Sequence, residues 1–185
     1  MFHLARASGV RQEAARFAAA RAAELPEAAS PNLTLWSPER IAAWRLTLEK
    51  PTPPPLGLLR IARIALEVPI LEGTDEWTLN RSVGHIAETA APGTDGNSGI
   101  AGHRDGFFRG LKDVRVGETL ELETLRGKHT YRIERIWIVA PEDVTVLDPT
   151  PAPSVTLVTC YPFYYIGSAP QRYIVRAVRQ STWTK

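Results

Sequence analysis

The sequence contains one cysteine, Cys160, in 185 residues. A single cysteine cannot form an internal disulfide, so it carries no information about the redox compartment. It also excludes zinc sites built on cysteine pairs, and no cluster of histidines and carboxylates has zinc-ligand spacing. The sequence therefore predicts no metal centre and no other cofactor.

Long apolar runs and an excess of one charge are also missing. No run of about 18 apolar residues is present, so we expect no transmembrane helix within this chain. The N-terminal region does not resemble a signal peptide, because charged residues interrupt it at Arg6, Arg11, Glu13, Arg16 and Arg21. The 22 basic residues are scattered and nearly balanced by 20 acidic ones, which argues against a nucleic-acid-binding groove.

What is present is enough apolar material for one core. The chain is 44% hydrophobic, and a chain of this length typically forms one domain with a short appendage. Residues 6–29, rich in Ala, Arg and Glu, predict a helix. The proline-rich segment 51–55 predicts a stiff connector. We therefore divide the chain into an N-terminal helical extension (1–50), the connector, and a main domain (56–185).

A second helix is predicted at the end of the extension. Ser37 is a good N-cap and is followed by a proline and a glutamate, which suit the first helical turn. Ile41, Trp44 and Leu48 share one stripe of this helix. We expect that stripe to dock on the main domain.

The main domain has a β pattern. Alternating and β-branched runs predict several short strands, among them 64–70, 120–123, 130–139, 155–159 and 172–178. Pro69 restricts its strand to an edge or a bulge, because proline has no backbone donor. The apolar phase slips between Ile133 and Ile136, which predicts a bulge. Short strands at this spacing predict a mainly β fold, closed or sandwich-like.

Cys160 stands where one of these strands ends. The β-branched run before it stops at Tyr161-Pro162, and a loop with Gly167 and Pro170 leads to a second strand beginning near Arg172. If the two strands pair antiparallel, Arg172 approaches the cysteine. A lone cysteine is often a small buried hydrophobe, but a thiol at a strand end beside a cation suits a nucleophile.

A cysteine nucleophile needs a histidine partner, and the chain has four histidines. His103 follows a short apolar run that ends at Gly102, so it also lies where a strand opens into a loop. His129 is expected on a solvated hairpin and His3 in a tail. The pattern favours Cys160 and His103 on the same rim.

These residues resemble a known family. Gly102-His-Arg-Asp105, Thr156-Leu-Val-Thr-Cys160 and the following Arg172 are similar to the signatures of the sortases, cysteine transpeptidases of bacterial surfaces. The resemblance covers about residues 56–180 and implies a closed sortase-type β-barrel of about eight strands with short helices. It implies His103, Cys160 and Arg172 as catalytic residues. Gly84-His85 and the wording after Cys160 are most similar to class D sortases, with class E next.

The resemblance also implies a reaction and its partners. A Leu-Pro-x-Thr-like signal near the C-terminus of a protein is cut after the Thr, which leaves a thioester on the cysteine. An amine on a cell-wall precursor, a pilin or another surface component then resolves it. The expected location is the outer face of a bacterial cell membrane. Sortases generally carry an N-terminal membrane helix, and we expect that anchor to be absent from this chain, the other explanation being an unanchored relative.

Further residues are candidates for substrate binding or support. Thr159 either shapes the oxyanion site or is a plain strand threonine, and Tyr161 belongs to an aromatic wall or to the core. His85 rivals His103 as a histidine before a loop, but it matches a non-catalytic histidine of the family. Asp105 either orients His103 or serves a surface turn. Some sortases bind calcium through loop carboxylates, yet solvated loop charge is our prediction for Glu67, Glu72, Asp75 and Glu76.

Two other functions stay open. A hydrolytic cysteine protease would use water in place of the amine, although a papain-like order is disfavoured because His103 precedes the cysteine. In a non-enzymatic β-domain, Cys160 would be structural and the helices would bind a partner.

Overall fold

The computed structural model describes residues 31–164 and 167–180, together with helical positions 9, 12, 15–17 and 19. The helix predicted over 6–29 lies mostly outside the described residues and stays a prediction. The strands are β1 (Gly57–Ile61), β2 (Leu66–Glu72), β3 (Val83–His85), β4 (Asn97–Ala101), β5 (Thr119–Thr124), β6 (Gly127–Val139), β7 (Ser154–Tyr161) and β8 (Gln171–Arg179). The helices are α2 (Pro38–Thr47) and α3 (Glu76–Arg81), with single 3-10 segments η1 (Leu33–Leu35), η2 (Ala62–Ile64), η3 (Phe107–Asp113) and η4 (Val144–Leu147).

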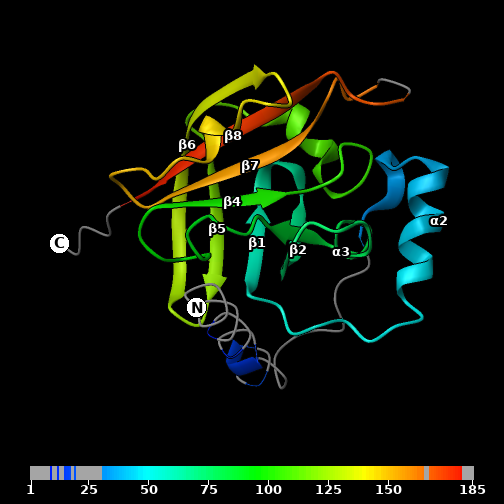
Figure 1. Ribbon diagram of the computed structural model, residues 1–185, viewed down its shortest axis with the longest axis horizontal. Helices are drawn as coiled ribbons and strands as arrows, with labels where there is room; N and C mark the ends of the chain where they lie inside the picture. Colours follow the sequence, from blue (N-terminus) through cyan, green and yellow to red (C-terminus); the bar gives the residue numbers. More distant parts are fainter. Residues whose placement is uncertain are drawn as a thin grey trace.

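The eight strands form a closed barrel in the order β1-β2-β3-β4-β7-β8-β6-β5, and β5 pairs with β1 to close it (Figure 1). Most neighbours are antiparallel, but β2 pairs with β3 and β4 with β7 in parallel. The predicted mainly β barrel with short helices is confirmed. Closure leaves no continuous free edge on the sheet, which protects the backbone donors and acceptors of every strand.

Strand alternation builds the core. Val155 and Leu157 on β7 and Val175 and Ala177 on β8 are fully buried and belong to the main apolar cluster. Successive strand residues point to opposite faces, so the residues between them face outward from the barrel. This alternation decides which side of the barrel carries the chemistry.

Two details of the strand prediction are settled by the pairing. The register of β6 against β8 shifts between Ile133 and Arg135, which confirms the predicted bulge. β2 is an inner strand and not an edge strand, contrary to the expectation from Pro69. Pro69 pairs with Leu58 on β1, whereas the pairing of β2 with β3 begins only at Ile70. Because no β3 residue lies opposite Pro69, the absence of a backbone N–H in proline removes no hydrogen bond between β2 and β3.

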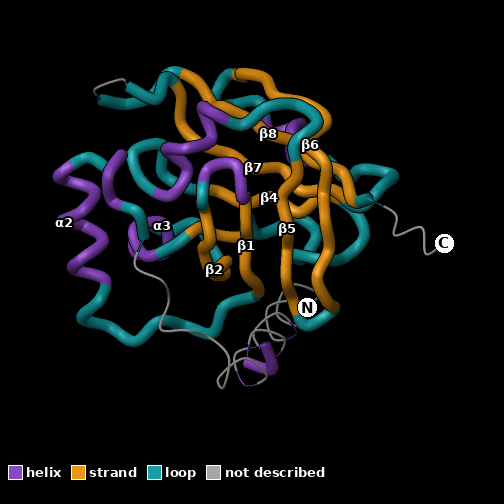
Figure 2. The backbone as a smooth tube through the Cα atoms, turned by 180° about the vertical axis from the view of Figure 1, so that it is seen from behind, coloured by secondary structure: helices purple, strands orange, loops and turns teal. Residues whose placement is uncertain are grey.

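α2 and α3 lie together at one side of the barrel, as both views show (Figures 1 and 2). Ser37 caps α2 as predicted, since its side chain accepts a hydrogen bond from the backbone of Arg40. Trp44 packs against the core, but Leu48 is 50% exposed and does not join the predicted docking stripe. At the other end of the helix, Trp36 packs against the core and makes an edge contact with Phe107, with ring centroids 4.7 Å apart.

Residues 51–55 are exposed or half-buried and form neither helix nor strand. The division of the chain at this segment stays a prediction. Among the residues that the structure describes, none of the helices combines the length and hydrophobicity needed to cross a bilayer.

The side chain of Asn97 on β4 forms hydrogen bonds with two other segments of the barrel. It is buried, and its amide nitrogen donates to the carbonyls of Val146 (3.2 Å) and Asp148 (3.1 Å) next to η4. Its amide oxygen accepts from Thr156 (2.7 Å) and Ser154 (3.3 Å) on β7. One side chain therefore fixes β4, β7 and the connection between β6 and β7.

Replacing Asn97 with alanine should lower the free energy of unfolding by roughly 2–4 kcal/mol, because several buried polar partners lose their hydrogen bonds. Chemical denaturation measures this. Asn32, an exposed cap of a short 3-10 turn, is the matched control. Asn32→Ala should cost about 1 kcal/mol or less. Equal losses in the two variants would contradict the assigned role of Asn97.

Candidate active site

Cys160 lies near the end of β7 on the outer face of the barrel. The core-facing residues of β7 alternate with it, and the side chain is half-buried. The strand ends one residue later at Tyr161, where the Tyr161–Pro162 peptide bond is cis. The nucleophile candidate therefore stands at a strand end, as the sequence predicted.

Arg172 is the direct cross-strand partner of Cys160 in the antiparallel β7–β8 pair. Directly opposite residues present their side chains on the same face of a sheet, so the guanidinium and the sulfur share the outer face. The Nη1 atom of Arg172 donates to the carbonyls of Ala169 (3.3 Å) in the preceding loop and of Gln171 (3.1 Å) at the start of β8. Nearby backbone carbonyls therefore hold the guanidinium group of Arg172 in place.

His103 reaches the same rim from the other side of β7. The parallel register pairs Ala101 with Val158, and the backbone N–H of Gly102 donates to the carbonyl of Val158 at 3.1 Å. His103 and Cys160 follow two residues after this last pair, beyond the end of β4, so the register directs the histidine loop toward the end of β7 that carries the cysteine. Neighbouring strands are about 4.8 Å apart, so the histidine, the cysteine and Arg172 occupy three adjacent backbones.

Thr159 locks this arrangement. Its side chain is buried, and its hydroxyl donates to the carbonyl of Gly102 at 2.7 Å. The residue before the cysteine is thus bonded to the residue before the histidine. The hydroxyl proton of Thr159 is therefore already donated to the carbonyl of Gly102.

Gly102 has no side chain for a packing reason. A Cβ at this position would lie 2.7 Å from the ring of Phe108 on η3. Phe108 is fully buried in the core. The chain therefore leaves β4 with its backbone pressed against an aromatic ring, which holds the start of the His103 loop.

The surroundings of His103 weaken its basicity. Its side chain is 19% exposed, and Nε2 is buried with no hydrogen-bond partner among the described residues. Burial and the positive charge of Arg40 lower the pKa of His103, while the carboxylates of Glu76 and Asp105 oppose them. Glu76 Oε1 lies 3.8 Å from Nε2. In this arrangement Nε2 is buried, and the carboxylate of Glu76 is its charged neighbour within ion-pairing distance.

Asp105 is held by the N-terminal extension and not by His103. Its two carboxylate oxygens accept from Arg40 Nε (3.0 Å) and Ser37 Oγ (3.1 Å). Burial raises the pKa of Asp105, but the charge of Arg40 and the hydrogen bonds from Arg40 and Ser37 outweigh it, so that the pKa is lowered. Asp105 is an anchored carboxylate rather than a bare surface turn.

His85 stands apart from these groups. It is 3% exposed on β3, with Nδ1 2.9 Å from Glu72 and Nε2 3.0 Å from the carbonyl of Ala90. The hydroxyl of Thr89 also lies 3.1 Å from Nε2. Both ring nitrogens are occupied, so the geometry favours a structural role over a direct one.

Tyr161 faces away from Cys160 because it is the next residue on the strand. Its ring stacks on Tyr173, with centroids 6.0 Å apart, and Phe163 contacts both rings edge-on. These aromatics pack against the barrel core. Tyr161 is therefore part of the barrel end and does not line the face that carries the sulfur.

Sequence reasoning missed two arginines that hold the loop after Cys160. Arg104 donates to the carbonyls of Pro162 (3.0 Å) and Gly167 (2.9 Å), and Arg109 donates to the carbonyl of Phe163. Arg104 lies within the Gly-His-Arg-Asp signature, so its place beside the histidine was the available signal. Together they fasten the loop after the cysteine to the loop after the histidine.

The four loop carboxylates considered for calcium have separate partners. Glu67 pairs with Arg60 and Glu72 with His85, each at 2.9 Å. Asp75 caps α3 by accepting from Thr78, and Glu76 faces Arg40 and His103. Over the described ranges, no three metal-binding side chains gather at one point.

Comparisons with known proteins identify the family of this chain. The model of the Sortase domain family matches residues 59–180. Sortase D of Bacillus subtilis is 38% identical over 124 residues, which cover 66% of this chain and 63% of that protein. Sortase SrtE1 of Streptomyces coelicolor is 36% identical over 125 residues, covering 57% of this chain and 36% of its own length. The chain thus spans less than two thirds of either relative.

A solved structure shows the same barrel. The structure of a sortase D transpeptidase of Clostridium perfringens superposes with a TM-score of 0.65 at 27% identity, covering 94% of this chain and 99% of that one. The matched family region contains β1 to β8 almost completely, and with them the rim that brings together Cys160, Arg172 and the His103 loop. This protein belongs to the sortase family.

Proposed function

We propose that this protein is a class D sortase that cuts a Leu-Pro-x-Thr-like sorting signal and transfers the acyl group to an amine. The observation that carries the proposal is the placement of a half-buried cysteine between an arginine on one neighbouring strand and a histidine loop on the other. Membership of a cysteine transpeptidase family supports it.

Each residue has one role in the proposed reaction. The Cys160 thiolate attacks the carbonyl carbon of the scissile peptide bond, a C–S bond forms, and His103 protonates the departing amine. Arg172 stabilises the oxyanion or holds the substrate carbonyls with its fixed charge. An incoming amine then gives up a proton to His103 and attacks the thioester, which restores the thiolate.

An apolar row beside the nucleophile suits an apolar signal. Two register positions before the Cys160–Arg172 pair, Val158 pairs with Ala101 on one side and Ile174 on the other, and Ile174 pairs with Trp137 on β6. Alternation puts this row on the outer face with the sulfur. Ile174 is fully buried in this row, so the half-buried Val158, Ala101 and Trp137 are the members that the leucine and proline of a sorting signal could contact.

The subclass, substrate and location rest on different arguments. Class D is favoured by the match to Sortase D of Bacillus subtilis and by the Clostridium structure, and class E is the alternative because of the Streptomyces relative. The expected substrate is a surface protein with a C-terminal signal. The acceptor amine belongs to a cell-wall precursor, a pilin or another surface component, and the enzyme acts outside the cell membrane.

A quenched Leu-Pro-x-Thr-Gly or Leu-Pro-x-Thr-Ala peptide tests the reaction. With an added amine, we expect a ligated product that mass spectrometry identifies, because the thioester is resolved by the amine. Cleavage that ignores the amine would instead support a hydrolytic protease. No turnover together with slow alkylation of the thiol would support a non-enzymatic domain.

Substitutions at the rim test the assigned roles. Cys160→Ala and His103→Ala should each abolish turnover of the peptide. Arg172→Lys should lower kcat/KM by roughly 10–100-fold, because the charge remains but the fork is lost. Arg132, an exposed arginine on β6, provides the control, and Arg132→Lys should leave kcat/KM unchanged. Turnover by Cys160→Ala would refute the scheme.

We also propose that the reaction needs no calcium. The carboxylates that might bind it are engaged in ion pairs and a helix cap. Peptide turnover should therefore be unchanged by EDTA and by added calcium chloride. A rate that falls with EDTA and returns with calcium would overturn this part of the proposal without affecting the roles of the three rim residues.

A further inference from the structure

We propose that Arg40, on the N-terminal helix α2, is a positioning residue for His103, so that α2 is a working part of the active site. The inference rests on the proposed function, because it assigns His103 as the acid and base. Arg40 does not touch the reacting atoms. It acts through Asp105 and through its own charge.

The first step is the attachment of α2 to the histidine loop. Arg40 Nε and Asp105 Oδ1 are 3.0 Å apart, and Ser37 Oγ donates to the other oxygen at 3.1 Å. The backbone N–H of Ser37 also donates to the carbonyl of Asp105 at 3.4 Å. Three hydrogen bonds therefore join the first turn of α2 to a single residue two positions after His103.

The second step is that Asp105 lies inside a turn closed on His103. The carbonyl of His103 accepts from the backbone N–H groups of Gly106 (3.1 Å) and Phe108 (3.2 Å). The aliphatic stem of Arg40 covers this turn, since its Cγ lies 3.2 Å from where a Cβ on Gly106 would stand. Holding Asp105 in place therefore holds the backbone that carries the imidazole.

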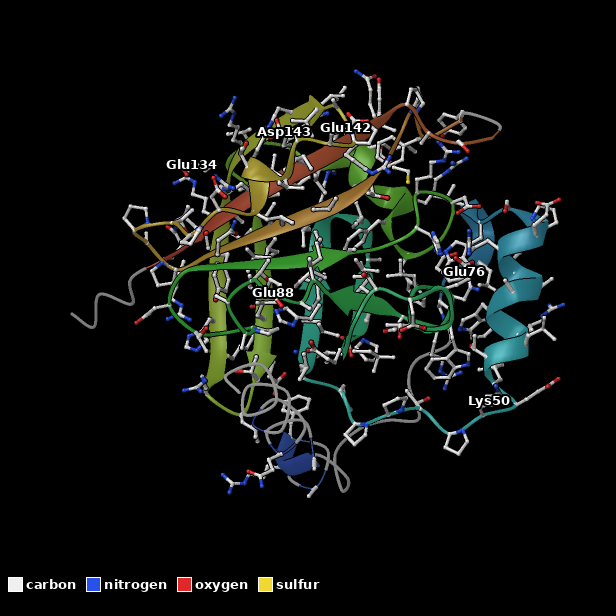
Figure 3. The ribbon with its side chains drawn as sticks, in the orientation of Figure 1. Lys50, Glu76, Glu88, Glu134, Glu142 and Asp143 are labelled. Carbon is white, nitrogen blue, oxygen red and sulfur yellow. The ribbon has the colours of Figure 1, made fainter. Side chains whose placement is uncertain are left out.

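The third step concerns the Nη1 atom of the Arg40 guanidinium, which points to α3. This atom donates to the buried side chain of Asn80 on α3 and lies 3.7 Å from Glu76 Oε1. Asn80 in turn donates to Glu76 at 3.1 Å. Figure 3 shows Glu76 beside α2 at this junction. The arginine thus spans from the histidine loop to α3.

His103 is consequently surrounded by charges from three segments. Arg40 comes from α2, Glu76 from α3, and Asp105 from the loop of His103 itself. The Arg40 side chain is 16% exposed and Asp105 30%, whereas Glu76 is 76% exposed. After burial, Arg40 has the largest effect on the pKa of His103, followed by the opposing effects of Glu76 and then Asp105, and solvent screens the exposed glutamate more strongly than the other two.

Arg40 and Asp105 shift the pKa of His103 in opposite directions, and this difference distinguishes an electrostatic role of the pair from a role in stability alone. Arg40 lowers the pKa of His103, and Asp105 raises it. Removing the charge of Arg40 should therefore raise the pKa of His103, so that the imidazolium persists to higher pH. Removing the charge of Asp105 should lower that pKa, so that the imidazolium deprotonates at lower pH. A role limited to stability would move neither value, or both in the same direction.

The test compares Arg40→Met, Arg40→Lys and Asp105→Asn in the full chain, with Arg45→Met as the control. Arg45 is an exposed arginine on the same helix. Peptide turnover gives kcat and KM across pH, NMR titration of the histidine rings gives the pKa of His103 directly, and thermal unfolding gives stability. The titration needs no substrate, so it reports on the proposal even if the peptide is the wrong one.

We expect Arg40→Met to raise the pKa of His103, to move the alkaline limb of the kcat/KM profile upward, and to lower kcat by about 10–100-fold with little change in KM. Asp105→Asn should shift the pKa of His103 downward. Arg40→Lys keeps the charge and should restore the pH profile while recovering only part of kcat, because lysine cannot bridge Asp105 and Asn80 together. Arg45→Met should match the unaltered protein.

The outcomes against the proposal are distinct. An unchanged titration and an unchanged kcat in folded Arg40→Met would overturn it. If Arg40→Met does not fold, equal His103 titrations in Asp105→Asn, Arg40→Lys and the unaltered protein would overturn it as well. A further outcome separates the two proposals. If the unaltered protein shows no transpeptidation, but the pKa of His103 rises in Arg40→Met and falls in Asp105→Asn, the proposed reaction is refuted while the effect of Arg40 on His103 still holds.

Discussion

The hydrogen-bonded register across β4, β7 and β8 is the constraint on which the site depends. The ladder bonds align Val158 with Ala101 on one side and Cys160 with Arg172 on the other. A slip by one residue would turn the sulfur into the core, because strand side chains alternate. The bond from Thr159 to the carbonyl of Gly102 and the buried amide of Asn97 both resist that slip.

Outside this ladder, the rim is held by charged side chains bonded to backbone carbonyls. Arg104 and Arg109 hold the loop after the cysteine, and Arg172 holds the loop before its own strand. An arginine suits this task because one planar group reaches two carbonyls. These bonds fix the described parts of the loops at Pro162, Phe163, Gly167 and Ala169.

Sequence patterns predicted most of what depends on neighbours in the chain. Cys160 and Arg172 lie on two strands joined by one loop, so their encounter follows from antiparallel pairing. The β6 bulge appeared as a phase slip, and the cap of α2 as Ser37 before a proline. His103 was proposed from its place after an apolar run, but the parallel pairing of β4 with β7 that precedes it left no periodic signal.

The contacts that the sequence did not reveal join distant segments through single polar groups. The pair of Arg40 and Asp105 spans 65 positions, and neither residue differs in pattern from an ordinary surface charge. Leu48 was expected to dock because it fits the apolar stripe, but α2 ends at Thr47 and the side chain of Leu48 is exposed. Pro69 was expected at an edge because the short extent of β3 is invisible before pairing is known.

The parallel contact of β4 with β7 has a consequence for how the enzyme comes into being. Asn97 and Ser154, at the start of this contact, are 57 positions apart, and such distant pairings form late because a long loop must first be closed. During synthesis the thiol and the imidazole therefore belong to separate, uncoupled pieces of chain. In the proposed reaction, the two residues can act together only once these distant strands have paired, so formation of the acylating centre would depend on completion of the barrel.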